Sequence, residues 1–260
     1  MSINIALCFD DRLQNYTTHV VNSIRQNTKE DVKFHFILAP FVSAKKIQDY
    51  WMNNIEVYEN TRIPELDKVR MNNGVRSKAQ YLRLLIPKLI KADKVIYLDN
   101  DIILDTDIKE LYDIDIVNNV VAMALDPFGH ELKDTQFFQG TISQKKYNLK
   151  VPSYLSGQMV INCDEWNRND ITETAIDIIQ KNNVCDMIAI NLACYNKIHK
   201  LDHLWNVPAN YINNEGIAVT PACVHQNYSG GKLYHWHGDK KPWNSRKVFF
   251  YSKYAEYMHK

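Results

Sequence analysis

The sequence lacks several features that would place it in particular classes of protein. It has no run of roughly 20 apolar residues that could span a bilayer, and no basic segment followed by an apolar stretch near its first residue. Its five cysteines form no C-x-x-C pair, which argues against a disulfide framework and against a zinc knuckle. We therefore expect a reduced, cytoplasmic protein.

The chain also lacks a strong net charge. Its 31 basic and 30 acidic residues leave a formal charge of +1, so no global field would collect nucleic acid, and we expect no such partner. A length of 260 residues suffices to bury one full core. Because no repeat or Pro/Gly/Ser-rich linker interrupts the chain, we predict one domain over residues 1–239 and a tail over 240–260.

Apolar, β-branched runs alternate with helical patterns, which is typical of an α/β fold whose sheet is covered on both faces. The predicted strands are residues 3–9, 33–39, 94–98, 119–125 and 158–162. The predicted helices are residues 17–26, a segment after Ser43, a segment after Ser77 that Pro87 kinks or breaks, and residues 171–180.

Asp99, Asn100 and Asp101 come directly after the predicted strand at 94–98, which is where open α/β sheets bind ligands. Two carboxylates at i and i+2 can converge on one hard divalent cation if the backbone turns sharply between them. Such an ion offsets the charge of a diphosphate. The alternative for this triplet is a turn with two solvated acids.

A second cluster of chemically able residues lies far downstream, in the segment 234–243 (YHWHGDKKPW). Histidine supplies a neutral nitrogen ligand, glycine lets the backbone approach a phosphate, and lysine supplies a point charge for phosphate oxygens. A loop whose aromatic residues only pack is the alternative.

The tail differs from the rest of the chain in composition. It holds six basic residues, one acid and six aromatic residues. Basic and aromatic residues at the edge of a domain suit adsorption to an anionic membrane surface, here the inner face of the cell membrane. The alternative is a docked C-terminal helix whose aromatic side chains complete the core.

Taken together, residues 95–102 (VIYLDNDI), 235–238 (HWHG) and 241–243 (KPW) resemble the retaining glycosyltransferases of family 8. That family includes bacterial lipopolysaccharide galactosyl- and glucosyltransferases and glycogenin. The resemblance extends from Ile3 to about Trp243. It implies the GT-A fold, in which a Rossmann-like nucleotide-binding half with a mostly parallel sheet is fused to an acceptor-binding half. It also implies UDP-sugar donors and Mn2+, with Mg2+ as an alternative.

The resemblance assigns Asp99, Asp101 and His235 as the metal ligands. It also implies that the whole triplet, Asn100 included, holds the nucleotide-sugar. Gly238 and Lys241 would contact the diphosphate.

Further assignments rest on the same resemblance. Asp10 matches the acid that reads the uracil, with the backbone of Cys8 beside it, although Asp10 also suits a helix N-cap. Arg83 would contact the diphosphate and the donor sugar, and its place on a helix alone suggests only a solvated or salt-bridged residue. Around the sugar the resemblance places Ser156, Gly157 and Gln158 near the donor, Asp186 at the sugar hydroxyls and Asp126 beside donor and acceptor. Among these residues we expect catalytic roles for Asp126, Asp186 and Arg83.

The sequence departs from the family pattern around the sugar. Leu155 replaces an asparagine, Gln158 comes after Gly157, and Met187 and Ile188 replace a glutamine and an acid. Val75 and Arg12 likewise stand where histidine and asparagine are usual. Because a thioether cannot form a glycosyl ester, we expect retention by front-face attack, with the leaving diphosphate accepting the proton of the acceptor.

The expected function is transfer of a hexose from a UDP-sugar, UDP-galactose or UDP-glucose, to a cell-envelope glycan or lipid-linked acceptor. Residues 128–154 form a predicted lid on the acceptor side. Two alternatives stay open among enzymes, an inverting GT-A transferase and a transferase that forms nucleotide-sugars. A third is a non-catalytic nucleotide-sugar or glycan-binding protein with a degenerate sugar pocket.

Overall fold

The computed structural model of the chain describes residues 2–11, 16–43, 54–70, 77–129, 131–134, 147–221, 223 and 227–258. Three predictions fall outside these residues: the helix after Ser43, the roles of Arg12 and Val75, and most of the lid, residues 130 and 135–146.

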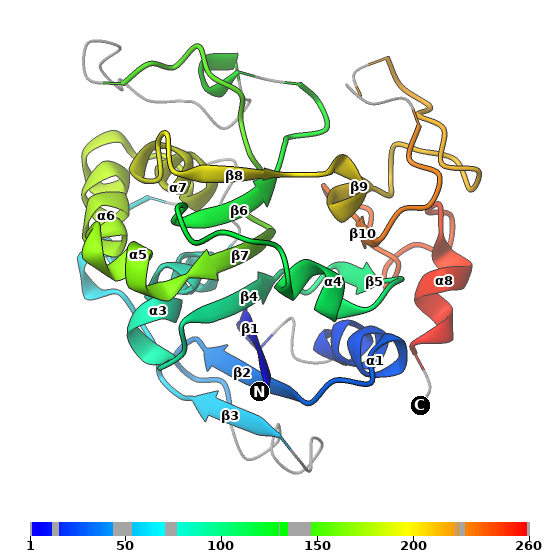
Figure 1. Cartoon of the computed structure of the whole chain (residues 1–260), viewed down its shortest axis with the longest axis horizontal. Helices are drawn as coiled ribbons and strands as arrows, with labels where there is room; N and C mark the ends of the chain where they lie inside the picture. The colour runs from blue at the N-terminus through cyan, green and yellow to red at the C-terminus, as the bar shows by residue number, and fades with distance from the viewer. Residues whose placement is uncertain are drawn as a thin grey trace.

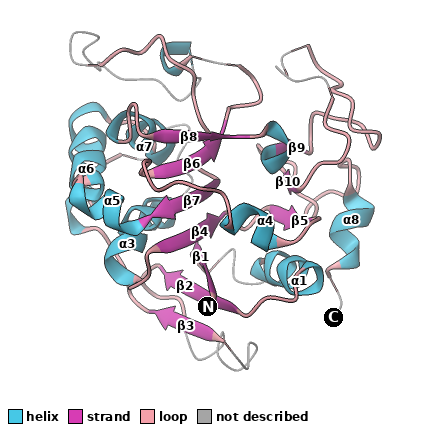
Figure 2. Ribbon diagram, in the orientation of Figure 1, coloured by secondary structure: helices cyan, strands magenta, loops and turns pink. Residues whose placement is uncertain are grey.

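Seven strands form the main sheet in the order β3-β2-β1-β4-β7-β6-β8 (Figure 2). In chain order they are β1 (Ile3–Phe9), β2 (Val32–Leu38), β3 (Ile55–Tyr58), β4 (Lys94–Leu98), β6 (Val121–Ala124), β7 (Gln158–Asn162) and β8 (Ile198–Leu201). Only β7 runs against its neighbours, and the other six strands point the same way. The predicted, mostly parallel α/β sheet is confirmed.

Helices cover both faces of this sheet (Figure 1). One face carries α3 (Ile86–Leu89), α5 (Cys163–Arg168), α6 (Ile171–Asn182) and α7 (Asp186–Ala193); the other carries α1 (Thr17–Asn27) and α4 (Ile108–Tyr112). Short 3₁₀ helices lie at Pro64–Leu66, Lys78–Leu85, Leu132–Asp134 and His203–Asn206. Among the described residues, none of the helices is both long and apolar enough to cross a membrane.

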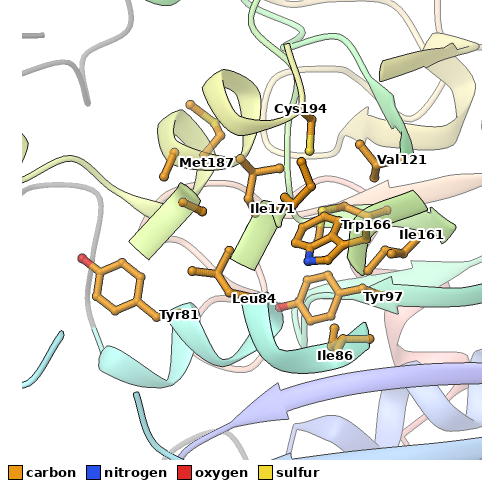
Figure 3. Packing of buried hydrophobic residues seen from close by; sticks show 14 of the residues in the cluster. Tyr81, Leu84, Ile86, Tyr97, Val121, Ile161, Trp166, Ile171, Met187 and Cys194 are labelled. Atoms are coloured by element: carbon orange, nitrogen blue, oxygen red, sulfur yellow. The ribbon is translucent and has the colours of Figure 1, made fainter. Parts of the chain in front are cut away.

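The core on the α5–α7 face is built around Trp166, which is fully buried and whose indole N–H donates to the Thr172 hydroxyl at 3.0 Å. Figure 3 shows the Trp166 ring beside Tyr97 and Ile161, with Met187 elsewhere in the same cluster. The strand residues of this layer alternate with those that face α1 and α4, as the two-residue period of a strand requires.

The segment after Ser77 is helical, as predicted, but its first part is a 3₁₀ helix, and the change of helix type falls between Leu85 and Ile86, just before Pro87. Ser77 is an N-cap: its hydroxyl accepts from the Ala79 amide at 3.2 Å, and the Gln80 side chain accepts from the Ser77 amide at 3.3 Å. A 3₁₀ helix then extends to Leu85, and α3 begins directly after it. Pro87 lies in the first turn of α3, where its missing N–H leaves no bond unmade.

A second, small sheet has the order β5-β10-β9 and comprises β5 (Ile102–Leu104), β9 (Val207–Pro208) and β10 (Leu233–His235). Strand β10 pairs antiparallel with β5 and parallel with β9. A third apolar cluster lies against this sheet and includes Trp236, which is fully buried.

Residues of the predicted tail belong to that third cluster. Helix α8 (Tyr251–Glu256) places Tyr254 in it, and Phe250 and Tyr257 are buried beside Tyr254. Phe249 is 37% exposed. The structure thus shows the packing that the sequence left as the alternative, and the membrane contact stays a prediction.

We predict that Tyr254→Ala lowers the free energy of unfolding by about 3 kcal/mol, because it removes a large buried ring from the third cluster. The Tyr254 hydroxyl is buried without a hydrogen-bond partner among the described residues, so Tyr254→Phe should be nearly neutral. Urea denaturation measures both variants. Equal stability of Tyr254→Ala and wild type would show that the segment does not contribute to the core.

Candidate active site

The candidate site lies at the edge of the main sheet where its parallel strands end. Asp10 follows the end of β1 there, and the triplet Asp99–Asp101 follows the end of β4. Strand β6 also ends there, two residues before Asp126. Because β7 runs in the opposite direction, its first residues start at the same edge, and the Asp99 amide donates to the Gly157 carbonyl at 2.7 Å. Segments distant in sequence therefore meet at one place.

His235 reaches this edge through the small sheet. Ile102, directly after the triplet, pairs with His235 in the β5–β10 ladder, and the Trp236 amide donates to the Asp101 carbonyl at 3.1 Å. This register places the His235 ring beside the Asp101 carboxylate, with 3.2 Å between His235 Nε2 and Asp101 Oδ1.

Asp99, Asp101 and His235 form a cluster with the geometry of a metal site. One ligand atom from each of the three lies within 4.8 Å of the others. A Cβ at position 157 would lie 2.6 Å from His235 Cε1 and 2.8 Å from Asp99 Oδ2, so only glycine fits there. Two carboxylates and an imidazole are a donor set that suits a divalent first-row cation such as Mn2+. These residues fit the metal that the family resemblance implies.

The charges around the triplet favour an additional cation. Burial raises the pKa of Asp99, and the nearby Asp101 carboxylate adds to that rise, against the opposing effects of Arg83 and His235. Burial acts in the same direction on Asp101, but Lys241 and His235 outweigh it and hold the pKa of Asp101 well below its ordinary value. Two partly buried carboxylates that repel each other would both gain from a shared divalent ion.

Lys241 joins the site from the loop after β10. Its ammonium donates to Asp101 Oδ2, which is 140 residues away in the chain, and to the carbonyl of Trp236, which is five residues away. Gly238 in the same loop adopts a φ of +73°, in the left-handed region that glycine tolerates best. The Lys241 ammonium therefore places positive charge beside the candidate metal position, as a diphosphate requires, and the contact of Gly238 with a diphosphate stays a prediction.

Arg83 connects the metal cluster to the sugar side of the site. Its guanidinium donates to Asp99 at 2.9 Å and to the Ser156 carbonyl at 2.8 Å, its Nε lies 3.1 Å from the Asp186 carboxylate in an ion pair, and its side chain is 4% exposed. The centre of the Tyr97 ring lies 4.6 Å from the guanidinium carbon. The guanidinium is thus engaged by the protein and fixes two carboxylates, and direct contact with a diphosphate stays a prediction.

Asn100 connects the strands on the side of the site where the resemblance expects the nucleotide. Its side-chain amide donates to the Cys8 carbonyl at 2.9 Å and its oxygen accepts from the Thr17 hydroxyl at 2.8 Å. These bonds tie the end of β4 to the end of β1 and the start of α1. Asp10 is buried two residues beyond Cys8, on the side where the resemblance expects the uracil.

The predicted sugar-side residues are buried at the same edge. The Ser156 hydroxyl lies 3.4 Å from Asp186, the first residue of α7, and the Phe128 amide donates to Asp126 at 3.1 Å. Leu155, Met187 and Ile188, which depart from the family pattern, are all buried in the apolar cluster of Figure 3. Apolar side chains thus stand where the family has sugar-binding polar groups.

Sequence reasoning missed three side chains that hold the site. The Tyr97 hydroxyl donates to Asp99, the side-chain oxygen of Asn206 lies 3.1 Å from His235 Nδ1, and the centre of the His237 ring lies 3.8 Å from that of His235. Burial and the neighbouring His235 hold the pKa of His237 well below its ordinary value, so its ring is neutral. Tyr97 could have been suspected from its place next to the triplet, whereas nothing in the sequence links Asn206 to His235.

Comparisons with known proteins agree with this arrangement. The profile of Glycosyl transferase family 8 matches residues 4–247. General stress protein A of Bacillus subtilis is 30% identical over 213 residues, which cover 75% of this chain and 71% of that protein. Probable galacturonosyltransferase 4 of Arabidopsis thaliana is 24% identical over 90% of this chain, which spans only 39% of the plant protein.

The solved structure of the galactosyltransferase LgtC, in complex with donor and acceptor sugar analogs, superimposes with a TM-score of 0.78. The match covers 98% of this chain and 95% of LgtC at 19% sequence identity, and it shows the shared fold. The sheet, the acids at its edge and this likeness define a glycosyltransferase of the GT-A fold.

Within that class, the chain belongs to glycosyl transferase family 8, and it is a hexosyltransferase.

We predict that Asp101→Asn weakens binding of Mn2+ by about 100-fold, because one charged ligand is lost while Lys241 remains as an uncompensated cation. Isothermal titration of the protein with MnCl2 measures the affinity without any substrate. Asp113→Asn, which alters an exposed acid paired with Lys109, serves as the control and should bind like wild type. If Asp101→Asn bound Mn2+ as tightly as the wild type, Asp101 would not be a metal ligand.

A second prediction concerns Arg83. Arg83→Lys should lower the free energy of unfolding by about 2 kcal/mol, because Arg83 faces Asp99 and Asp186 with two separate nitrogens of its planar fork and a single ammonium does not reproduce that geometry, so a carboxylate loses its partner. Arg168→Lys, at an exposed Arg–Glu pair, should change stability by less than about 0.5 kcal/mol. If urea denaturation gave the same small change for both, Arg83 would not bridge the two acids.

Proposed function

We propose that this chain transfers a hexose from a UDP-sugar to a hydroxyl of a glycan acceptor with retention of configuration, and that the reaction depends on Mn2+. The observation that carries the proposal is the cluster of Asp99, Asp101 and His235, with the Lys241 ammonium on Asp101. This combination has the charge and the donor atoms that a nucleotide diphosphate with its divalent ion requires.

In this mechanism Asp99, Asp101 and His235 hold the cation, which supplies positive charge for the departing diphosphate. Lys241 contacts Asp101 and stabilises the charge that develops on the leaving oxygens, and the family resemblance adds the backbone of Gly238 to this role. Asn100, Cys8 and Asp10 bind the nucleoside end of the donor. Arg83 keeps Asp99 and Asp186 in place through its two ion pairs.

Retention results from front-face attack in this proposal. The bond between the anomeric carbon and the β-phosphate oxygen breaks as the bond to the acceptor oxygen forms on the same face, and the acceptor proton passes to a phosphate oxygen. Met187 stands where the family carries a glutamine, and a buried thioether gives no covalent sugar ester. Asp126, Asp186 and Ser156, with Gly157 and Gln158, form the walls of the sugar pocket and orient the ring.

We further propose UDP-galactose or UDP-glucose as the donor and a cell-envelope glycan, lipid-linked or lipopolysaccharide-like, as the acceptor. The enzyme would then act at the cytoplasmic side of the membrane. The support for the acceptor is the family resemblance, together with a likeness to a galactosyltransferase solved with donor and acceptor sugar analogs.

The proposal predicts Mn2+-dependent release of UDP from one of five donors, UDP-glucose, UDP-galactose, UDP-GlcNAc, UDP-GalNAc and UDP-galacturonic acid. The last is included because relatives carry the name galacturonosyltransferase. Release should fall at least about 100-fold with EDTA or with Asp101→Asn, since the leaving group then loses its counter-charge. NMR of the product with a model acceptor reports the anomeric configuration.

Four results would contradict parts of this proposal. A donor that raises the melting temperature with Mn2+ but never releases UDP would show a binding protein with a degenerate pocket. An inverted product would show an inverting transferase, and a trapped glycosyl-enzyme adduct would exclude front-face attack. UDP release that EDTA leaves unchanged would exclude the metal role.

A further inference from the structure

The two nitrogens of His235 face different oxygen atoms. Nδ1 lies 3.1 Å from the side-chain oxygen of Asn206, and Nε2 lies 3.2 Å from Asp101 Oδ1. His235 and Asn206 are both almost fully buried, at 5% and 2% exposure, so water does not compete for these contacts. An amide oxygen can only accept a hydrogen bond, and so can an ionised carboxylate.

These contacts select one form of the neutral imidazole. Since Asn206 Oδ1 requires a proton on Nδ1, the neutral ring presents the lone pair of Nε2 to Asp101. A lone pair and a carboxylate oxygen that face each other repel unless a proton or a metal cation lies between them. The Nδ1–H tautomer is therefore the form of His235 that can ligate a metal through Nε2 at this position.

We propose that Asn206 is the positioning residue that holds His235 in its metal-binding tautomer. Asn206 reaches the ring from the end of the 3₁₀ helix His203–Asn206, next to β9, which pairs with β10. The strand pairing sets the position of His235, and Asn206 sets the orientation and the proton of its ring. This inference rests on the metal site of the proposed function.

The opposite arrangement would give the site different chemistry. If the Asn206 amide group were turned by half a rotation, its NH2 would donate to Nδ1, and Nε2–H would then donate to Asp101. His235 would in that case be a hydrogen-bond donor to the carboxylate and no ligand. The two arrangements differ in which ring nitrogen carries the proton, and this difference can be measured.

The first experiment is ¹⁵N NMR of the wild-type protein without metal, with long-range ¹H–¹⁵N correlations across the imidazole of His235. The measurement is made at pH 8, above the ordinary titration range of histidine, with His235→Gln as the assignment control. Protonated Nδ1 and bare Nε2 support the proposal. A proton on Nε2 overturns it, whatever the metal affinity.

The second experiment measures Mn2+ affinity of the full chain by isothermal titration. Asn206→Leu should weaken it about 10- to 100-fold, because the ring loses the bond that orients it. Asn206→Asp keeps an acceptor opposite Nδ1 and should bind at least as tightly as wild type. A carboxylate at position 206 can accept a hydrogen bond from Nδ1 but cannot donate one. If Asn206→Asp bound Mn2+ as weakly as Asn206→Leu, an acceptor opposite Nδ1 would not be what orients the ring, and the proposal would be overturned.

Asn22→Leu is the matched control for the loss of a buried amide. Asn22 donates to the Tyr257 carbonyl at 3.0 Å, in contact with the tail, so its variant should lose stability and keep the wild-type Mn2+ affinity. If Asn206→Leu also kept that affinity, the positioning role would be wrong while the metal site stood. If the wild type bound no Mn2+, the proposed function and this inference would fail together.

Discussion

The pairing of β10 with β5 is the constraint on which the site depends. Strand β5 begins directly after the acidic triplet, and its first residue, Ile102, is the partner of His235. The ladder therefore fixes the distance between the two acids and the histidine before any ligand is considered. The third apolar cluster, with Trp236 and Tyr254, packs against this small sheet and holds the ladder in place. Packing far from the chemistry thus determines the geometry of the ligand atoms.

Charge compensation is the second requirement of this arrangement. Asp186 is buried at this edge of the sheet and Asp99 and Asp101 are partly buried there, where unpaired carboxylates are costly. Arg83 offsets Asp99 and Asp186, and Lys241 offsets Asp101, so each acid has a cationic neighbour. The remaining repulsion between Asp99 and Asp101 is what a divalent ion would relieve. The same groups that stabilise the fold therefore prepare the site for a metal and a diphosphate.

Local pattern was sufficient for much of the fold. The strands at Ile3–Phe9, Lys94–Leu98 and Gln158–Asn162 agree with their predicted limits, because runs of apolar β-branched residues between polar ends mark a buried strand. The triplet and the segment 234–243 stood out by position and residue chemistry, the family resemblance assigned roles to Asp99, Asp101, His235 and Lys241, and the structure brings these four together. The partners of these groups could not be predicted, because the contact of Asn206 with His235 and that of Arg83 with Asp186 depend on tertiary packing.

The central claim is that Asp99, Asp101 and His235 bind one divalent cation. Crystals grown with MnCl2 and UDP, measured at the manganese absorption edge, test it most directly. The account predicts one anomalous peak within coordination distance of both carboxylates and of His235 Nε2, with the diphosphate oxygens as further ligands and Lys241 beside them. A peak that lacks any of the three side chains, or UDP bound at this edge with no peak, would contradict it.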